Sequence, residues 1–293
     1  MSGAPRGGRE RLKVSAMAGE LSATRAKELY DAGDLRGAVE AVTAEVKASP
    51  SDAARRTFLF ELLCFAGEWE RAARQLDVLG HQSADAEAGV QVYHNCIKAE
   101  LDRQKLVAHG LQPHFLAEPP PYVDLHLAAL NHLRVGDPRA AREALDRAEE
   151  ERPALPCVVN GARADDFRDY NDFFAPVLEL IVHDKYTWVP LEHVTRFEVE
   201  PPKQLRDLVW AVAQVETAGN ELRAHLPALY VNSGRHPNDL VRLGRMTDWQ
   251  EAGDELYTAA GLRLFAAGGE EQSVHHIRAV AFERRGEDET APA

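Results

Sequence analysis

The chain has 293 residues, about twice the length of a common single domain, so the sequence predicts two domains. Apolar residues make up 45% of it and charged residues 28%, values that exclude an intrinsically disordered, collagen-like or disulfide-stapled chain. The formal net charge is −13, so the surface repels phosphate groups, which argues against nucleic acid and anionic membranes as partners.

The two ends of the chain are expected to be flexible tails, over residues 1–20 and 285–293. The first tail contains basic residues among Gly, Pro and Ser, but no apolar stretch follows, so it is not a secretory signal, and Met17 is an alternative start. No segment approaches the roughly 20 apolar residues that cross a bilayer, so no membrane insertion is expected. The three cysteines lack zinc-type spacing and fit a reducing compartment. We therefore expect a cytoplasmic protein.

A short motif of Gly, an acidic residue, three further residues and Ala occurs three times in the first half of the chain. It starts at Gly33, Gly67 and Gly136. The first two glycines are 34 positions apart and the last two are 69 apart, one more than two such periods. This is the tetratricopeptide spacing, and it predicts pairs of antiparallel helices that turn at each Gly.

The residues that follow each Gly also fit paired helices. Five positions beyond the Gly lies an Ala, where two helices approach too closely for a larger side chain, and four further on lies an apolar residue. These residues are Ala38, Ala72 and Ala141, and Val42, Leu76 and Leu145. Residues 84–108 fit one longer helix without a Gly-acid turn, a degenerate unit of the repeat. We therefore predict an all-α, tetratricopeptide-like helical domain over residues 21–155.

The composition changes after this helical domain. Residues 156–172 contain Pro, Gly and a run of acidic residues, which predicts a linker. Over residues 173–284, β-branched and aromatic residues become frequent, with tight-turn signals between them. The segments expected to form strands are Val177–Val182, Tyr186–Val189, a strand that begins at Phe197, Leu208–Glu216, Glu221–Leu226, Leu262–Phe265 and Val274–Phe282. The expected fold class is therefore α+β, a helical repeat array followed by a smaller, mainly antiparallel β domain.

The sequence contains no pattern typical of a catalytic, cofactor or metal site. The twelve His residues do not complete a zinc-ligand set with the cysteines, and there is no Gly-x-Ser-x-Gly turn for a nucleophilic Ser. No Gly-rich phosphate-binding loop is followed by Lys and Ser or Thr. We therefore predict no catalytic residues, no cofactor, no metal and no enzymatic activity. Stacked helix pairs make an extended concave surface, which favours a protein-binding module.

Several segments carry longer and more specific patterns than the repeat. They are Arg56–Ala72, Ala175–Glu179, Trp188–Pro190, Glu200–Leu208, Leu226–Tyr230 and Leu243–Trp249. Together they resemble the ImpE family, also called SciE-type or TagJ, which are virulence-associated accessory proteins of bacterial type VI secretion systems. The resemblance covers about residues 21–282. It implies a non-enzymatic cytoplasmic protein that binds the N-terminal helix of the small contractile-sheath subunit and so modulates sheath assembly or its recycling by the ClpV ATPase.

The family offers no catalytic residues to carry over, so candidate contacts come from the repeat geometry. With each Gly as position 15 of its unit, positions 5, 9 and 12 of the first helices face a concave groove. An amphipathic partner helix is expected to lie in this groove. The residues predicted to contact it are Lys27, Tyr30, Thr57, Glu61, His126 and Leu130.

Alternatives remain open for both the surface and the function. The partner helix could instead dock on the sheet domain or on an exposed edge of the array. The chain could be a tetratricopeptide-like scaffold or chaperone for another cytoplasmic protein. It could also be an enzyme, if the sheet domain brings Glu179, His225 and Asp248 together. The sequence does not predict the oligomeric state.

Overall fold

The computed structural model describes residues 24–80 and 84–283, so both predicted tails lie outside the described residues. Helices dominate the first half of this part of the chain. They are α1 (Arg25–Ala32), α2 (Leu35–Ala48), α3 (Ala53–Phe65), α4 (Trp69–Gly80), α5 (Ala84–His109), α6 (Pro121–Arg134) and α7 (Pro138–Glu151), with a short α8 (Asp239–Arg242) later in the chain. No helix among the described residues is both long and apolar enough to span a bilayer.

The three predicted helical hairpins are confirmed as α1–α2, α3–α4 and α6–α7. Each turns at its Gly, and Gly33, Gly67 and Gly136 have positive φ values of 88°, 66° and 81°, where a side chain would be strained. The acidic residue after the Gly caps the next helix in two of the hairpins, because the Asp34 and Asp137 side chains accept backbone N–H groups of its first turn. The small residues at the close approach of the helices are fully buried: Ala38, Ala72 and Ala141.

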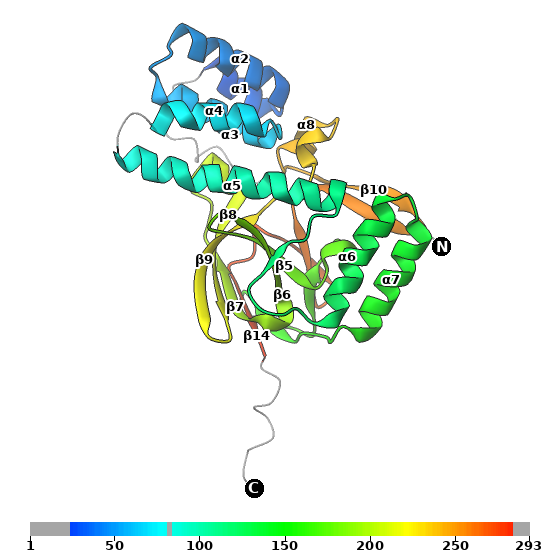
Figure 1. The fold of residues 1–293 in the computed structure, drawn as a ribbon. Helices are drawn as coiled ribbons and strands as arrows, with labels where there is room; N and C mark the ends of the chain where they lie inside the picture. Colours follow the sequence, from blue (N-terminus) through cyan, green and yellow to red (C-terminus); the bar gives the residue numbers. More distant parts are fainter. Residues whose placement is uncertain (1–23, 81–83, 284–293) are drawn as a thin grey trace.

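Helix α5 interrupts the regular stacking of these hairpins. Helices α1 to α4 pack consecutively, and α5 packs on α4 at one end and reaches strand β6 (Lys185–Pro190) with its other part. The α6–α7 hairpin lies on the other side of the molecule from α1–α4, with α5 running between them (Figure 1). The array is therefore two stacked hairpins, a long connecting helix and one separate hairpin.

Strands form most of the second half of the described chain. They are β1 (His114–Phe115), β2 (Cys157–Val159), β3 (Ala162–Ala164), β4 (Phe167–Asp169), β5 (Val177–Val182), β6, β7 (Val194–Val199), β8 (Trp210–Thr217), β9 (Asn220–Pro227), β10 (Thr247–Gly253), β11 (Leu256–Gly261), β12 (Leu264–Ala267), β13 (Glu270–Ser273) and β14 (Ala279–Phe282). Short 3-10 helices connect some of them: η2 (Asp172–Phe174), η3 (Leu191–His193), η4 (Leu205–Leu208) and η5 (Ser233–Arg235).

The main sheet has nine strands in the order β1-β6-β5-β9-β8-β7-β14-β2-β3. Among the described residues only the β1–β6 pair of this sheet is parallel, so the prediction of a mainly antiparallel sheet is confirmed. A three-stranded sheet, β13-β12-β4, and the β10–β11 hairpin complete the strands of the described residues. The predicted hairpins β5–β6 and β8–β9 are present in full register.

Two expectations about the strands are wrong. Residues 156–172 are not an irregular linker, because β2 and β3 lie in the main sheet and β4 lies in the three-stranded sheet. β2 and β3 form a local hairpin with an Asn160-Gly161 turn, a signal that the linker prediction overlooked. The partners of β2 and β4 in the sheets, β14 and β12, are more than 90 positions away, so no local pattern signals those pairings. Only the end of Val274–Phe282 is a strand, and the Gly268-Gly269 turn joins β12 to β13 instead.

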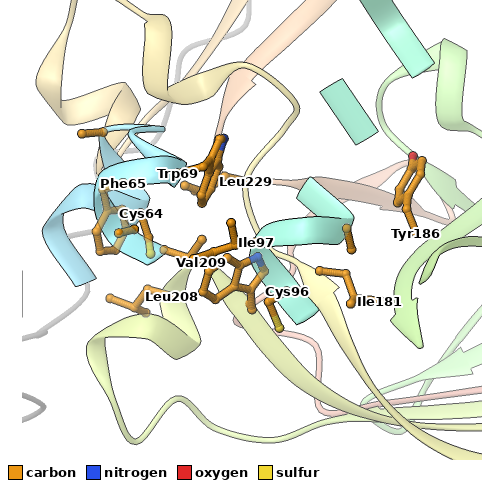
Figure 2. Packing of buried hydrophobic residues seen from close by; sticks show 14 of the residues in the cluster. Cys64, Phe65, Trp69, Cys96, Ile97, Ile181, Tyr186, Leu208, Val209 and Leu229 are labelled. Atoms are coloured by element: carbon orange, nitrogen blue, oxygen red, sulfur yellow. The ribbon is translucent and has the colours of Figure 1, made fainter. Parts of the chain in front are cut away.

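The main sheet separates two hydrophobic clusters. The helix-facing cluster joins the helices to residues such as Val177, Ile181 and Trp210, and the Trp69 and Trp210 rings lie 5.9 Å apart. Figure 2 shows residues of α3, α4 and α5 meeting residues of the sheet and its loops in this cluster. The inner cluster lies between the main sheet and the three-stranded sheet, where Phe167 contacts Phe197. The helices and the face of the main sheet toward them therefore share one of the two clusters.

Candidate functional site

The six residues predicted to contact a partner do not line one open groove. Tyr30, Glu61, His126 and Leu130 are buried, with 3 to 7% of their surface exposed, whereas Lys27 and Thr57 are half-buried. Tyr30 of α1 lies beside α3, where its ring meets Phe58 edge to face. His126 and Leu130 lie on α6, in the separate hairpin. Contact of a partner with these residues stays a prediction, but the single concave groove on which it was based is not present.

Loops of the sheet domain cover the inward face of α1 and α3. The Arg206 guanidinium of η4 lies 2.7 Å from a carboxylate oxygen of Glu61, and burial raises the pKa of Glu61 although Arg206 acts to lower it. The Arg245 guanidinium donates to the Tyr30 backbone carbonyl at 2.8 Å and lies 4.7 Å from the centre of the Tyr30 ring. In this conformation a partner helix has no access to Tyr30 or Glu61.

A cluster of buried charges fixes α5 on the sheet. The buried ion cluster consists of Glu100, Arg103, Asp169, Glu179 and Arg263. Arg103 Nε lies 2.8 Å from Glu179 Oε1 and Arg103 Nη1 lies 3.3 Å from Glu100 Oε2. Arg263 pairs with both Asp169 and Glu179. The cluster links α5 to the neighbouring strands β4 and β5 and to Arg263, which precedes β12.

The two central carboxylates of this cluster differ in their electrostatics. Burial acts to raise the pKa of Glu179, but two guanidinium groups outweigh it and lower this pKa to about 2. Burial raises the pKa of Asp169 to about 6, because one Arg does not compensate for it. The adjoining cavity is only about 30 Å³, room for roughly one or two waters. The cluster therefore fits a structural role rather than substrate binding.

The residues considered for an enzyme have separate partners. Glu179 belongs to the buried ion cluster, and the His225 ring lies against Tyr93 of α5. Asp248 pairs with His236, with 3.0 Å between the carboxylate and Nε2. These contacts give each residue a structural role.

One large cleft opens at an end of the main sheet. We call it the sheet-end cleft, and its volume is about 820 Å³. Its lining comes from five segments, within residues 116–118, 153–155, 189–195, 217–220 and 282–283. Three of these segments are places where β6, β8 and β14 end and where β7 and β9 begin, on the lower side of Figure 1. The other two follow β1 and α7. Sequence reasoning missed this cleft, because no local pattern connects the five segments.

The fold defines a class of protein, in which tetratricopeptide-like helical hairpins pack on a mixed nine-stranded sheet. The sequence pattern of the ImpE protein family matches residues 161–281. The chain is also 36% identical over 259 residues to the "Type VI secretion system accessory component TagJ" of Pseudomonas aeruginosa, and covers 91% of that protein with 88% of its own length. The chain therefore belongs to the ImpE (TagJ) family, as its sequence segments indicated.

A solved structure has the same fold. The crystal structure of protein VPA1032 from Vibrio parahaemolyticus matches with a TM-score of 0.82 and 26% sequence identity. The match covers 89% of this chain and 98% of that one. The helical hairpins and the sheet are thus a shared arrangement and not a peculiarity of this sequence.

Proposed function

We propose that this chain is a non-enzymatic accessory protein of a bacterial type VI secretion system. The observation that carries the proposal is its similarity, along nearly its whole length, to a protein named as the accessory component TagJ. A relative at this identity and coverage shares the fold, and it supports the same role in the same machine. The place of action would then be the cytoplasm.

We further propose that the partner is the small subunit of the contractile sheath, bound through its N-terminal helix. The protein would thereby modulate sheath assembly or ClpV-driven recycling of the sheath. Helical hairpins and clefts are surfaces on which an amphipathic helix can dock with its apolar face. The size of the shared core supports a rigid platform for such docking, because helices and sheet bury one continuous cluster.

The predicted contact residues divide into two groups within this proposal. Lys27 and Thr57 are half-buried and can contact a partner directly. Tyr30, Glu61, His126 and Leu130 could do so only if the covering loops or the α6 hairpin moved, which would break contacts such as Arg206–Glu61. The docking surface therefore has to be sought elsewhere as well.

The test is a binding titration with the purified full chain and the small sheath subunit of a type VI secretion system from the same organism. Fluorescence anisotropy of the labelled subunit is compared for the intact subunit and for a version without its first helix. We expect saturable binding of the intact subunit and at least a tenfold loss without the helix. Absence of binding by the intact subunit would contradict the proposal and favour a scaffold role for another cytoplasmic protein.

A further inference from the structure

We propose that the sheet-end cleft is the docking site for a cationic, amphipathic segment of a protein partner. The proposal deepens the proposed function and rests on it for the identity of that partner. It places the contact on the sheet domain and away from the inward face of α1 and α3. Three features of the cleft support it: its apolar floor, its acidic rim and a lining that, among the described residues, contains no fully buried polar side chain.

The floor of the cleft is apolar and preformed. Leu191 and Val194 are fully buried beneath it, and Leu155 and Phe282 are partly exposed toward it. Leu116 at the rim has 41% of its surface exposed, which is high for a large apolar side chain. Exposed apolar surface inside a hollow is typical of sites that receive apolar side chains of a partner.

Three carboxylates lie at the rim, and one of them, Glu283, is paired with Arg163 outside the lining. Glu118, Glu192 and Glu283 line the cleft, and no Lys or Arg is among the described residues that do so. The Tyr122 hydroxyl donates to Glu192 at 2.9 Å, and Arg163 lies 3.1 Å from the Glu283 carboxylate. These two carboxylates are therefore held in place at the rim. A partner with Lys or Arg beside its apolar residues would complement this arrangement, and electrostatic attraction would orient it.

The composition of the lining disfavours other kinds of ligand. A phosphate-bearing ligand would meet three carboxylates and no described Lys or Arg. Small-molecule sites contain a few convergent polar groups, yet none of the fully buried polar side chains among the described residues lines this cleft. An amphipathic polypeptide segment needs neither a phosphate site nor such a set.

The test uses the full chain and two labelled peptides in anisotropy titrations. One peptide is the first helix of the small sheath subunit, and the other is a model helix of about 18 residues with Leu on one face and Lys on the other. Glu118→Lys reverses an exposed rim charge, and Leu116→Ser removes an exposed apolar contact. The matched controls are Glu40→Lys on α2 and Val135→Ser after α6, both exposed and remote from the lining.

We expect each cleft variant to weaken binding of the model peptide about five- to tenfold, and each control to change it less than about twofold. The effect of Glu118→Lys should shrink at high salt, and that of Leu116→Ser should not. A model peptide that fails to bind, or that loses equal affinity in cleft and control variants, would overturn the proposal.

The two peptides separate the two proposals. If the sheath peptide fails to bind while the model peptide binds in a Glu118-dependent way, the sheath partner is wrong and the cleft stands. If the sheath peptide binds equally to wild type, Glu118→Lys and Leu116→Ser, the sheath partner stands and the cleft is wrong.

Discussion

The two sides of the main sheet are built on different physical principles. Consecutive residues of β5 show this, because Leu178 and Leu180 belong to the inner cluster, whereas Glu179 between them belongs to the buried ion cluster. The inner cluster consists of apolar buried residues against the three-stranded sheet. The helix-facing side combines apolar packing with buried charges that pair across α5 and the sheet.

This difference shows how the helices and the sheet are held in one arrangement. Apolar contacts depend on area and shape and tolerate small shifts of one element over another. A buried carboxylate between two guanidinium groups tolerates no such shift. A buried charge that loses its partner lowers the free energy of unfolding by about 3 to 5 kcal/mol. We therefore expect the ion cluster to set the position of α5, and the inner cluster to contribute stability without titratable groups.

The largest effect is expected from Glu179→Gln. The amide keeps the size of the side chain but leaves Arg103 and Arg263 facing a neutral group in a buried site. We expect a loss of about 3 to 5 kcal/mol in the free energy of unfolding, measured by urea denaturation. Glu198→Gln on β7, an exposed carboxylate paired with Arg196, is the control and should change it by less than about 1 kcal/mol. Equal losses in the two variants would show that the buried cluster is not needed for stability.

The inner cluster is tested by Leu180→Ala, one position along the same strand. Leu180 is fully buried in an apolar environment, so its truncation should cost about 3 kcal/mol. No ionisable group is among the residues of this cluster apart from the buried Cys157 thiol, so the cost should be the same at pH 5 and pH 7. A cost that changes strongly with pH would mean that the two sides of the sheet are not independent.

A smaller, pH-dependent effect is expected at His126 on the helix-facing side. Burial lowers its pKa to about 4, below its usual value of 6.5. Between these values the unfolded chain binds a proton that the folded chain does not, so stability is present above pH 6.5 and is lost as the pH falls toward 4. From pH 7 to pH 5 the loss should be about 2 kcal/mol.

The comparison of wild type with His126→Gln isolates this contribution, with His132→Gln on the same helix as control. The pKa of Asp169 is raised to about 6, so its titration acts in the opposite direction, but it is common to all three proteins and cancels. Thermal melts at pH 5 and pH 7 should show a smaller pH dependence for His126→Gln alone. A pH dependence like that of wild type would contradict a buried, neutral His126.

The sequence predicted local structure well where the turn chemistry was explicit. The Gly-acid turns specified the helical hairpins, and Gly219 marked the β8–β9 turn with a φ of 109°. The β10–β11 hairpin was missed because its turn residues are Asp254 and Glu255, both with positive φ, where Asn-Gly or Asp-Gly is the usual signal. Strands β2 to β4 have only three residues each, too few for a periodic pattern, and the Asn160-Gly161 turn between β2 and β3 was assigned to the linker.

The candidate sites were harder to predict because they are assembled from distant segments. Tyr30 and Glu61, two of the positions predicted on α1 and α3, are buried, but nothing in the repeat shows that Arg206 and Arg245 cover them. The buried ion cluster had a weak signal in its lone charges, Glu179 and Arg263, inside apolar segments. The sheet-end cleft had none, because its walls meet only through the order of the strands.

The smallest effect is expected where the same two elements meet at the surface. Lys98 of α5 lies 2.9 Å from Asp184 in the β5–β6 turn, and both side chains are about half exposed, 51% and 42%. The hydrogen bond from Lys98 lowers the pKa of Asp184, but water and salt screen this pair. Asp184→Asn should therefore change the melting temperature by less than about 2 °C, with no remaining effect at high salt.

Scanning calorimetry of Asp184→Asn and of Glu179→Gln compares the surface contact with the buried one, because each variant removes one carboxylate from the contact between α5 and the β5–β6 hairpin. A loss in Asp184→Asn as large as that in Glu179→Gln would place the anchor of α5 at the surface. A small loss, with a large one for Glu179→Gln, would place it in the buried ion cluster.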